Sequence, residues 1–281
     1  MNKIIAGIKL IRPLNGLVAA LSLVAAAAVA HGRLELPRLE AAAVFFLVSF
    51  GYVINDIFDQ GADRMNRPQR ALPSGAVTVK EAWMIAQGML VVGLGVALAG
   101  GTRLFSYYVA VALVLMLYAK ALSSRLLVSN IVVAALCASV FLLPTWQKNA
   151  GSVDWSAVLA AITLTFLFNL MREIVKDIED IAGDRVLSRT TVPIRFGAGR
   201  ARLIASLIGL LVVLASVAAD GALNRSITYL TIVIIGVDLP LAILFILYLR
   251  RDPVGFAGRV SVVLKVLMVP ALVALAAAGV K

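Results

Sequence analysis

The sequence predicts an all-α membrane protein with nine transmembrane helices in a single bundle. Hydrophobic residues make up 62% of its 281 positions and charged residues only 15%, and the mean hydropathy is +0.99. Soluble domains are far more polar. A transmembrane helix needs about 20 mostly apolar residues. Suitable runs occur at about residues 12–31, 39–59, 80–100, 104–121, 127–147, 155–176, 203–219, 226–249 and 260–279.

Short polar segments rich in glycine or proline separate these runs, as expected for loops between helices. They include residues 32–37, 100–101, 148–154 and 250–258. No long polar segment interrupts the pattern, so we expect one membrane domain over residues 1–281. The single cysteine, Cys137, lies in an apolar run, which leaves no disulfide framework and no cysteine metal site to consider.

A first acidic motif follows the second apolar run, in the stretch GYVINDIFDQGADRMNRPQRALPSG at residues 51–75. Its three aspartates recur at spacings i, i+3 and i+7, which is one face of a helix: they are Asp56, Asp59 and Asp63. A charge at membrane depth costs roughly 2.5 kcal/mol or more unless it is neutralised. A metal ion is the natural partner for three converging carboxylates.

Basic and amide side chains come next in the same stretch: Asn66, Arg67 and Arg70. Their donors suit the anionic end of a substrate. Pro68, Pro73 and Gly75 then predict the end of the helix and a shaped loop.

A second acidic motif closes the sixth run, in NLMREIVKDIEDIAGDRVLSRTTVP. It repeats the DxxDxxxD spacing with Asp177, Asp180 and Asp184, whereas Glu179 points to the opposite helical face. If the two runs are neighbours, the motifs face each other across a polar cavity. Hard cations that bridge carboxylates to phosphate oxygens suit such a cavity. The sequence therefore predicts a Mg²⁺ site that binds a diphosphate.

Two other interpretations of these acids stay open. Either motif alone could form solvated ion pairs with its basic neighbours, which are Arg64, Arg67, Arg172, Lys176 and Arg185. A cation- or proton-coupled transporter also uses intramembrane acids, and Asp238 before Pro240 in the eighth run suits that class. The alternative for Asp238 is a buried carboxylate bonded to a neighbouring helix. Transporter acids usually lie near the bilayer midplane, whereas both motifs lie at the ends of runs.

The basic residues set an orientation. They are dispersed among apolar runs and not gathered on one soluble face, so the net charge of +11 does not indicate a nucleic-acid partner. Alternating the loops leaves only six of the 26 Lys and Arg on one side, which are Arg33, Arg38, Arg103, Lys148, Arg225 and Lys281. The positive-inside rule then predicts a cell-membrane protein with a cytoplasmic N-terminus, an external C-terminus and both motifs facing the cytoplasm.

The two motifs together, NDIFDQGAD with NRPQR and REIVKDIEDIAGD with TTVP, resemble the UbiA-type intramembrane prenyltransferase superfamily over nearly the whole chain. The resemblance implies a nine-helix bundle that binds Mg²⁺ and an isoprenyl diphosphate. It implies metal binding by the six motif aspartates and diphosphate binding by Asn66, Arg67, Arg70 and Lys120. It assigns the reaction to Asn55, Asp59, Tyr118, Lys120 and Asp180. Two departures are the short spacing of Tyr118 and Lys120, and Ala71 in place of the usual proline after Arg70.

Within the superfamily, three features resemble the branch that prenylates a glycerol phosphate ether. They are IRPLNG at residues 11–16, the Ser129–Asn130 pair and the REIVKDIEDIAGD form. The implied donor is geranylgeranyl diphosphate, and the implied acceptor is a geranylgeranylglyceryl phosphate in ether-lipid biosynthesis. Prenylation of an aromatic acceptor of the 4-hydroxybenzoate, homogentisate, naphthoate or chlorophyllide type is the alternative.

Overall fold

The structure is a computed structural model that describes residues 3–147, 152–223 and 225–280. Its described residues form helices and loops without strands, and nine helical segments there are long and apolar enough to cross a membrane. They are Lys3–His31, Arg38–Phe58, Val79–Ala99, Thr102–Leu122, Val128–Trp146, Trp155–Glu179, Ala198–Gly221, Ile227–Leu249 and Pro253–Gly279. The predicted class, an all-α membrane protein with nine spans, is confirmed. Lys148 and Lys281 lie outside the described residues.

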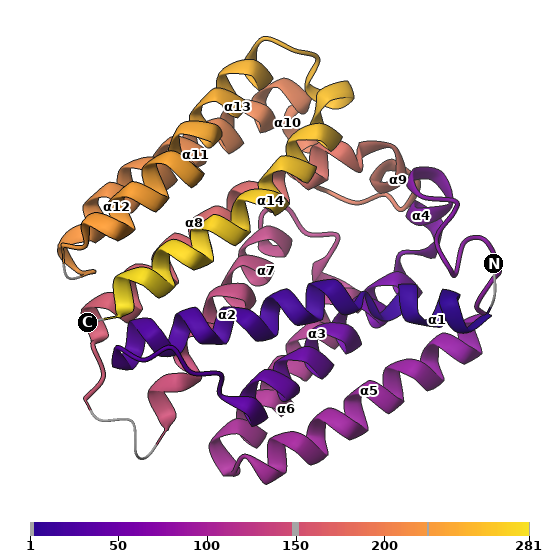
Figure 1. Cartoon of the computed structure of the whole chain (residues 1–281). Helices are drawn as coiled ribbons and strands as arrows, with labels where there is room; N and C mark the ends of the chain where they lie inside the picture. Colours follow the sequence, from indigo (N-terminus) through magenta and orange to yellow (C-terminus); the bar gives the residue numbers. More distant parts are fainter. Residues whose placement is uncertain (1–2, 148–151, 224, 281) are drawn as a thin grey trace. The chain divides into compact units, whose positions relative to one another are not determined.

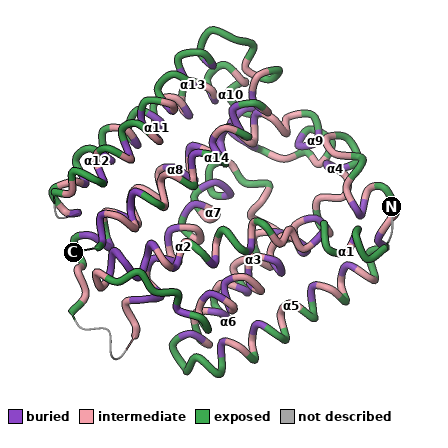
Figure 2. Tube along the Cα trace, in the orientation of Figure 1, coloured by how far each residue is buried: buried purple, intermediate pink, exposed green. Residues whose placement is uncertain are grey.

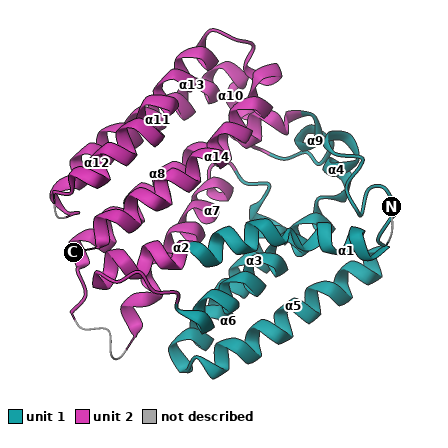
Figure 3. Cartoon of the chain, in the orientation of Figure 1, with its two compact units in different colours: residues 1–21, 37–125, 182–189 teal, residues 22–36, 126–181, 190–281 magenta. Residues whose placement is uncertain are grey.

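The helices group into two compact units (Figure 3). Unit 1 contains residues 1–21, 37–125 and 182–189, and unit 2 contains residues 22–36, 126–181 and 190–281. The expectation of one domain and one bundle over the whole chain stays a prediction.

Unit 1 is built around α3, which packs against α5 and α6 (Figure 1). Its elements are α1 (Lys3–Ile11), the first part of α2 (Pro13–His31), α3 (Arg38–Phe58), α4 (Gln60–Asn66), α5 (Val79–Ala99), α6 (Thr102–Leu117), a π-helix (Tyr118–Leu122) and most of α9 (Ile181–Val186). Close packing of α5 on α6 depends on Gly93, because a Cβ there would overlap the Tyr108 hydroxyl at 1.9 Å. The Tyr108 hydroxyl donates to the Met89 carbonyl at 3.3 Å.

Unit 2 is built around α8, which packs against α7, α11 and α14. Its helices are α7 (Val128–Ser139), α8 (Trp155–Glu179), α10 (Val192–Phe196), α11 (Ala198–Ala218), α12 (Ile227–Val233), α13 (Leu239–Leu249) and α14 (Pro253–Gly279), with 3₁₀ turns at Val140–Leu142, Pro144–Trp146 and Ala219–Gly221. A π-helix, Ile234–Asp238, joins α12 to α13. It precedes Pro240, which cannot donate a backbone hydrogen bond, and a π turn accommodates that loss.

Exposed residues occur along the helices of both units (Figure 2), and many of them carry large apolar side chains. Leu98 on α5 is 62% exposed, Leu113 on α6 is 65% exposed and Ile235 in the second π-helix is 65% exposed. A soluble protein would not expose so many large apolar side chains together. These faces therefore fit contact with lipid.

One predicted loop is wrong. The sequence interpretation left residues 250–258 as a loop, but α14 already begins at Pro253. Asp252 is its N-cap and accepts a hydrogen bond from the Gly255 N–H at 2.5 Å, and proline at the first helical position needs no donor partner. The start of α14 was therefore indicated in the sequence by an aspartate followed directly by a proline.

Candidate functional site

Both acidic motifs interrupt their helix at the second aspartate. In the first motif α3 ends at Phe58, Asp59 has φ −91° and ψ 7°, and α4 follows. In the second motif α8 ends at Glu179, Asp180 has φ −95° and ψ 5°, and α9 follows. The local structure repeats as the shared DxxDxxxD spacing predicts. A single unbroken helical face is not present, because the middle aspartate adopts the bridge conformation between the two helices.

Asp56 and Asp63 are buried in unit 1 and share Arg70. The Arg70 Nη1 lies 2.7 Å from Asp63 Oδ2 and 3.4 Å from Asp56 Oδ1. Arg12 also contacts Asp56, because its Nη2 lies 2.5 Å from Asp56 Oδ1. The Arg12 guanidinium lies 4.5 Å from the centroid of the Tyr52 ring. A guanidinium thus lies against each buried carboxylate, which offsets part of the cost of burying the charge.

Arg189 joins the two motifs inside unit 1. Its guanidinium forms ion pairs with Asp59 of the first motif and with Asp184 of the second, the latter at 3.3 Å. Burial lowers the pKa of Arg189, but the two aspartates outweigh burial and raise the pKa above its ordinary value. The last aspartate of the second motif therefore lies beside the first motif.

A hydrogen bond between α4 and α9 supports this arrangement. Asn66 Oδ1 accepts from the backbone N–H of Gly183 at 3.0 Å. The two helices can approach this closely because residue 183 lacks a side chain: a Cβ there would lie 2.4 Å from Asn66 Nδ2 and 2.7 Å from the Ala62 carbonyl oxygen. The resemblance assigned Asn66 to the diphosphate. Through its hydrogen bond to Gly183, Asn66 also fixes the position of the adjacent Asp184.

We expect Gly183→Ala to lower both stability and activity. The added methyl group must push α4 and α9 apart, which costs about 1–3 kcal/mol in well-packed sites, and it moves Asp184 relative to Arg189. Thermal unfolding in detergent and prenyl transfer measure the two effects. Gly199→Ala on α11 is the matched control, because a Cβ there meets nothing within 4 Å. Equal behaviour of the two variants would contradict this role of Gly183.

Asp177 and Asp180 belong to unit 2. Asp177 Oδ2 accepts a hydrogen bond from Asn130 Nδ2 on α7 at 2.9 Å, and Asp180 is half-buried at the C-cap position that follows α8. Glu173 is buried on the same helix and pairs with Arg172 at 2.7 Å and Lys176 at 3.4 Å. Glu173 is thus a buried carboxylate that two basic residues of its own helix neutralise, and not a solvated ion pair.

The remaining candidate residues lie in unit 1. Tyr118 is half-buried and Lys120 is exposed, both in the π-helix that packs against α3. Arg67 is half-buried where α4 ends. Among the described residues, Asn55 Oδ1 is buried and has no hydrogen-bond partner. Buried polar atoms normally have one, so this oxygen beside Asp56 lacks a partner that a ligand or a water molecule would supply.

The donor chemistry of the aspartates fits Mg²⁺, since this ion prefers carboxylate and phosphate oxygens. Within the described part of the chain, no group of three or more acidic, histidine or cysteine side chains is already gathered for a metal. Arginines hold the carboxylates of the first motif instead. An anionic ligand would offer these arginines new partners, and the carboxylates would then be released for a cation.

Sequence reasoning missed Arg12 and Arg189 as partners of the acidic motifs. Both lie in sequence motifs quoted above: Arg12 lies in IRPLNG, and Arg189 lies in SRTTVP. Their neighbours in space are 44 and 130 residues away in sequence, so no local spacing could reveal them.

Asp238, the residue that suited a transporter, is bonded to a neighbouring helix. It is 4% exposed, and Ser216 on α11 donates to its Oδ2 at 2.8 Å. The Tyr229 hydroxyl donates to the Ser216 carbonyl at 2.8 Å. This is the structural alternative stated for Asp238, a buried carboxylate between packed helices.

These features define a multi-pass, all-α membrane protein with paired aspartate motifs. The sequence profile described as the UbiA prenyltransferase family matches residues 16–260. The digeranylgeranylglyceryl phosphate synthase of Methanopyrus kandleri is 36% identical over 208 residues, covering 73% of this chain and 74% of that protein. The chain belongs to the UbiA prenyltransferase family and is a prenyltransferase.

Solved structures share the fold. One of them is 31% identical to this chain with a TM-score of 0.72, and each chain is covered completely. It comes from work on structural and mechanistic insights into the biosynthesis of digeranylgeranylglyceryl phosphate synthase in membranes. A UbiA homologue from Archaeoglobus fulgidus bound to GPP and Mg²⁺ is 17% identical with a TM-score of 0.63, covering 94% of this chain and 99% of that one.

Proposed function

We propose that this enzyme transfers the geranylgeranyl group of geranylgeranyl diphosphate to a geranylgeranylglyceryl phosphate, with Mg²⁺ as cofactor. The observation that carries the proposal is the full-length likeness to digeranylgeranylglyceryl phosphate synthase, at 31% identity over all of both chains. The Archaeoglobus fulgidus homologue with this fold, which binds GPP and Mg²⁺, supports the class of donor and the metal.

The motif aspartates would hold the metal. They are Asp56, Asp59 and Asp63 of the first motif and Asp177, Asp180 and Asp184 of the second. Bound there, Mg²⁺ supplies positive charge to the diphosphate oxygens and makes the diphosphate a better leaving group. Asn66, Arg67, Arg70 and Lys120 would bind the same diphosphate. Arg70 supports this role, because its guanidinium already lies within 2.7 Å of an aspartate of the first motif.

The reaction breaks the bond between the allylic carbon and a diphosphate oxygen. The arginines and Lys120 stabilise the charge that develops on the leaving group. Asn55 and Tyr118 would flank the allylic cation and exclude water from it, and the orphaned Asn55 Oδ1 supports that place. The acceptor hydroxyl oxygen then forms the new ether bond, its proton is lost to solvent, and diphosphate leaves.

The charge of the loops supports a phosphate on the acceptor. Eight basic residues lie in the segments after the two motifs and at the end of the fourth span: Arg64, Arg67, Arg70, Lys120, Arg125, Arg185, Arg189 and Arg195. Mg²⁺ can balance the charge of both the aspartates and the donor's diphosphate, which leaves several cations for a second phosphate. An aromatic carboxylate needs only one.

An acceptor competition tests the proposal. Purified protein receives geranylgeranyl diphosphate, Mg²⁺ and an equimolar mixture of geranylgeranylglyceryl phosphate, 4-hydroxybenzoate and homogentisate, and mass spectrometry identifies the products. We expect the ether product almost alone, and none when EDTA replaces Mg²⁺. An aromatic product without the ether would overturn the acceptor and leave the enzyme class intact.

We also propose that the N-terminus and the active-site cavity face the cytoplasm, because the loops on that side carry most of the Lys and Arg residues. A reporter enzyme that is active only outside the cytoplasm tests the orientation. It should be active when fused after Lys281 and inactive when inserted after Gly75. The reverse result would contradict the orientation and leave the proposed reaction untouched.

A further inference from the structure

Five arginines lie at one end of unit 2, where α11 and α14 begin and α13 ends. The Arg202 guanidinium on α11 donates to the Tyr248 carbonyl at 3.2 Å and to the Arg251 carbonyl at 2.6 Å. These carbonyls belong to the end of α13 and to the turn that follows it. Arg202 therefore fixes the start of α11 against the turn between α13 and α14. The five residues form the arginine cluster: Arg200, Arg202, Arg250, Arg251 and Arg259.

Two aromatic rings lie between two arginines of the cluster. The Arg202 guanidinium lies 6.0 Å from the centroid of the Tyr248 ring, and the Arg259 guanidinium lies 5.7 Å from that of Phe256. The two ring centroids are 6.2 Å apart. The Tyr248 hydroxyl donates to the Pro253 carbonyl at 2.8 Å, which ties α13 to the start of α14. Guanidinium groups placed against rings lose less freedom when they bind an anion.

The cluster carries more positive charge than the acids around it can balance. Four of its members are exposed, and no ion pair joins them to an acid in the described part of the chain: Arg200, Arg250, Arg251 and Arg259. Asp252, in the same turn, accepts a hydrogen bond from the Gly255 N–H at 2.5 Å. Glu179 comes near as well, because its Oε1 lies 3.8 Å from the place of a Cβ on Gly258. Two carboxylates thus face five guanidinium groups.

Exposed apolar side chains continue from the cluster along the same helices. Leu203 and Leu207 are exposed on α11, and Ile246 and Leu249 are exposed on α13. Leu203 follows Arg202 directly, and Leu249 precedes Arg250. The helices α11 and α13 pack against each other. A ligand here therefore meets cations at the helix ends and hydrocarbon along the helices.

We propose that the arginine cluster binds the phosphate headgroup of an anionic membrane lipid, whose chains lie against the exposed apolar side chains of α11 and α13. Guanidinium groups suit phosphate because they can donate two parallel hydrogen bonds to its oxygens. Basic residues at the membrane surface attract anionic lipids. A soluble acidic partner would match the charge of the cluster but not the apolar surface beside it. The inference does not depend on the proposed reaction or its acceptor.

A double variant, Arg250→Gln with Arg251→Gln, tests the cluster without touching the buried core, because both side chains are exposed. Delipidated protein in detergent is titrated with phosphatidylglycerol or phosphatidylcholine of the same chain length, and native mass spectrometry measures the bound lipid. We expect the wild type to prefer phosphatidylglycerol. The double variant should bind phosphatidylglycerol about tenfold more weakly, since each basic residue near an anionic surface contributes about fivefold, and should bind phosphatidylcholine unchanged.

The matched control is Arg33→Gln with Arg38→Gln, which also removes two exposed arginines but none of the cluster. It should bind phosphatidylglycerol as the wild type does. The proposal is overturned if the wild type shows no preference for the anionic lipid, or if the two double variants lose equal affinity for it.

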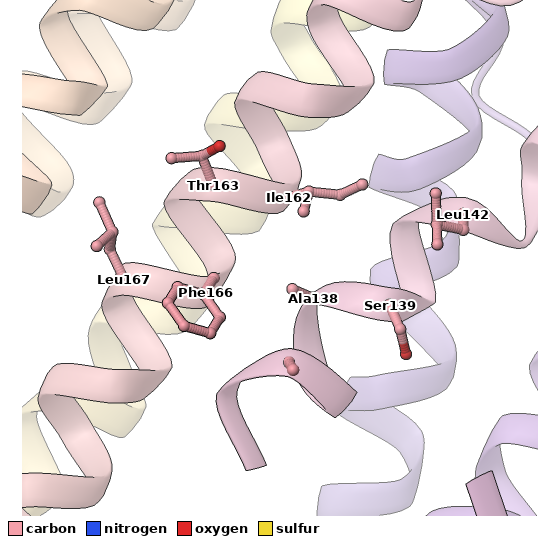
Figure 4. A pocket seen from close by; sticks show the side chains of 8 residues that line it. Ala138, Ser139, Leu142, Ile162, Thr163, Phe166 and Leu167 are labelled. Carbon is pink, nitrogen blue, oxygen red and sulfur yellow. The ribbon is translucent and has the colours of Figure 1, made fainter. Parts of the chain in front are cut away.

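A photoreactive group on the phosphatidylglycerol headgroup locates the lipid on the wild-type protein by peptide mass spectrometry. Labels within residues 198–207 or 246–260 support the cluster. Unit 2 also has an apolar groove of about 330 Å³ between α7 and α8 (Figure 4), and none of its lining residues is charged. Because nothing in that lining selects an anionic headgroup, labels confined to the groove would overturn the proposal.

Transfer kinetics separate a membrane lipid from the acceptor, which also carries a phosphate under the proposed function. In phosphatidylcholine nanodiscs, Arg250→Gln with Arg251→Gln should leave the KM for geranylgeranylglyceryl phosphate unchanged. A raised KM would assign these arginines to the acceptor and overturn their assignment to a membrane lipid. Failure of the proposed acceptor in the competition experiment would leave the lipid titration and the headgroup label unaffected.

Discussion

Prenyl transfer should be abolished when any one of four motif aspartates is replaced by asparagine: Asp56, Asp59, Asp177 or Asp180. Asparagine keeps the shape but loses the negative charge that a metal ligand supplies. Substitutions in the second shell of metal sites already cost about 10- to 100-fold, so we expect the loss for a ligand to exceed about 100-fold. Product formation from geranylgeranyl diphosphate at saturating Mg²⁺ measures it.

This test needs two controls, a matched variant and a measurement of folding. Glu179→Gln removes a carboxylate from the same helix as Asp177, but on the opposite face, and should be nearly silent. Asp56→Asn also weakens an ion pair with Arg12, so thermal unfolding must show that each variant remains folded in detergent. If Glu179→Gln were as damaging as Asp180→Asn, the assignment of the acidic face would be wrong.

The transmembrane helices could be predicted because lipid imposes a simple requirement on sequence. A span must satisfy its own backbone hydrogen bonds and stay apolar for about 20 residues, and each of the nine runs met that test. Helix ends were less predictable. The seventh run was expected from residue 203, yet the span begins at Ala198, because the polar and small residues before it continue the helix outside the apolar core.

Only the part of the site that depends on spacing along the sequence could be predicted. DxxDxxxD located the six aspartates, and the break of each helix at Asp59 and Asp180 follows a repeat visible in the sequence. The pairing of Arg189 with Asp59 spans 130 residues and depends on how α9 packs against α4. Spacing along the chain therefore identified the acids but not the cations that neutralise them.

Arg189→Gln should be the most destabilising substitution of a basic residue in the absence of Mg²⁺. The Arg189 side chain is 13% exposed, and its partners Asp59 and Asp184 are 16% and 5% exposed. Breaking a buried ion pair leaves an uncompensated charge and typically costs 3–5 kcal/mol, so we expect about 3 kcal/mol at this partly exposed site. The unfolding temperature in EDTA, measured at one heating rate, should fall by several degrees.

Arg185→Gln is the matched control, because Arg185 lies in α9 but is exposed, and exposed charges contribute little. Mg²⁺ with an isoprenyl diphosphate should restore more stability to Arg189→Gln than to the wild type, since a ligand stabilises the folded state that it binds. In the wild-type protein the same cation must displace Arg189 from the carboxylates, whereas in the variant it meets them without the Arg189 guanidinium. If Mg²⁺ and donor stabilised both proteins equally, Asp59 and Asp184 would not be the carboxylates that receive the metal.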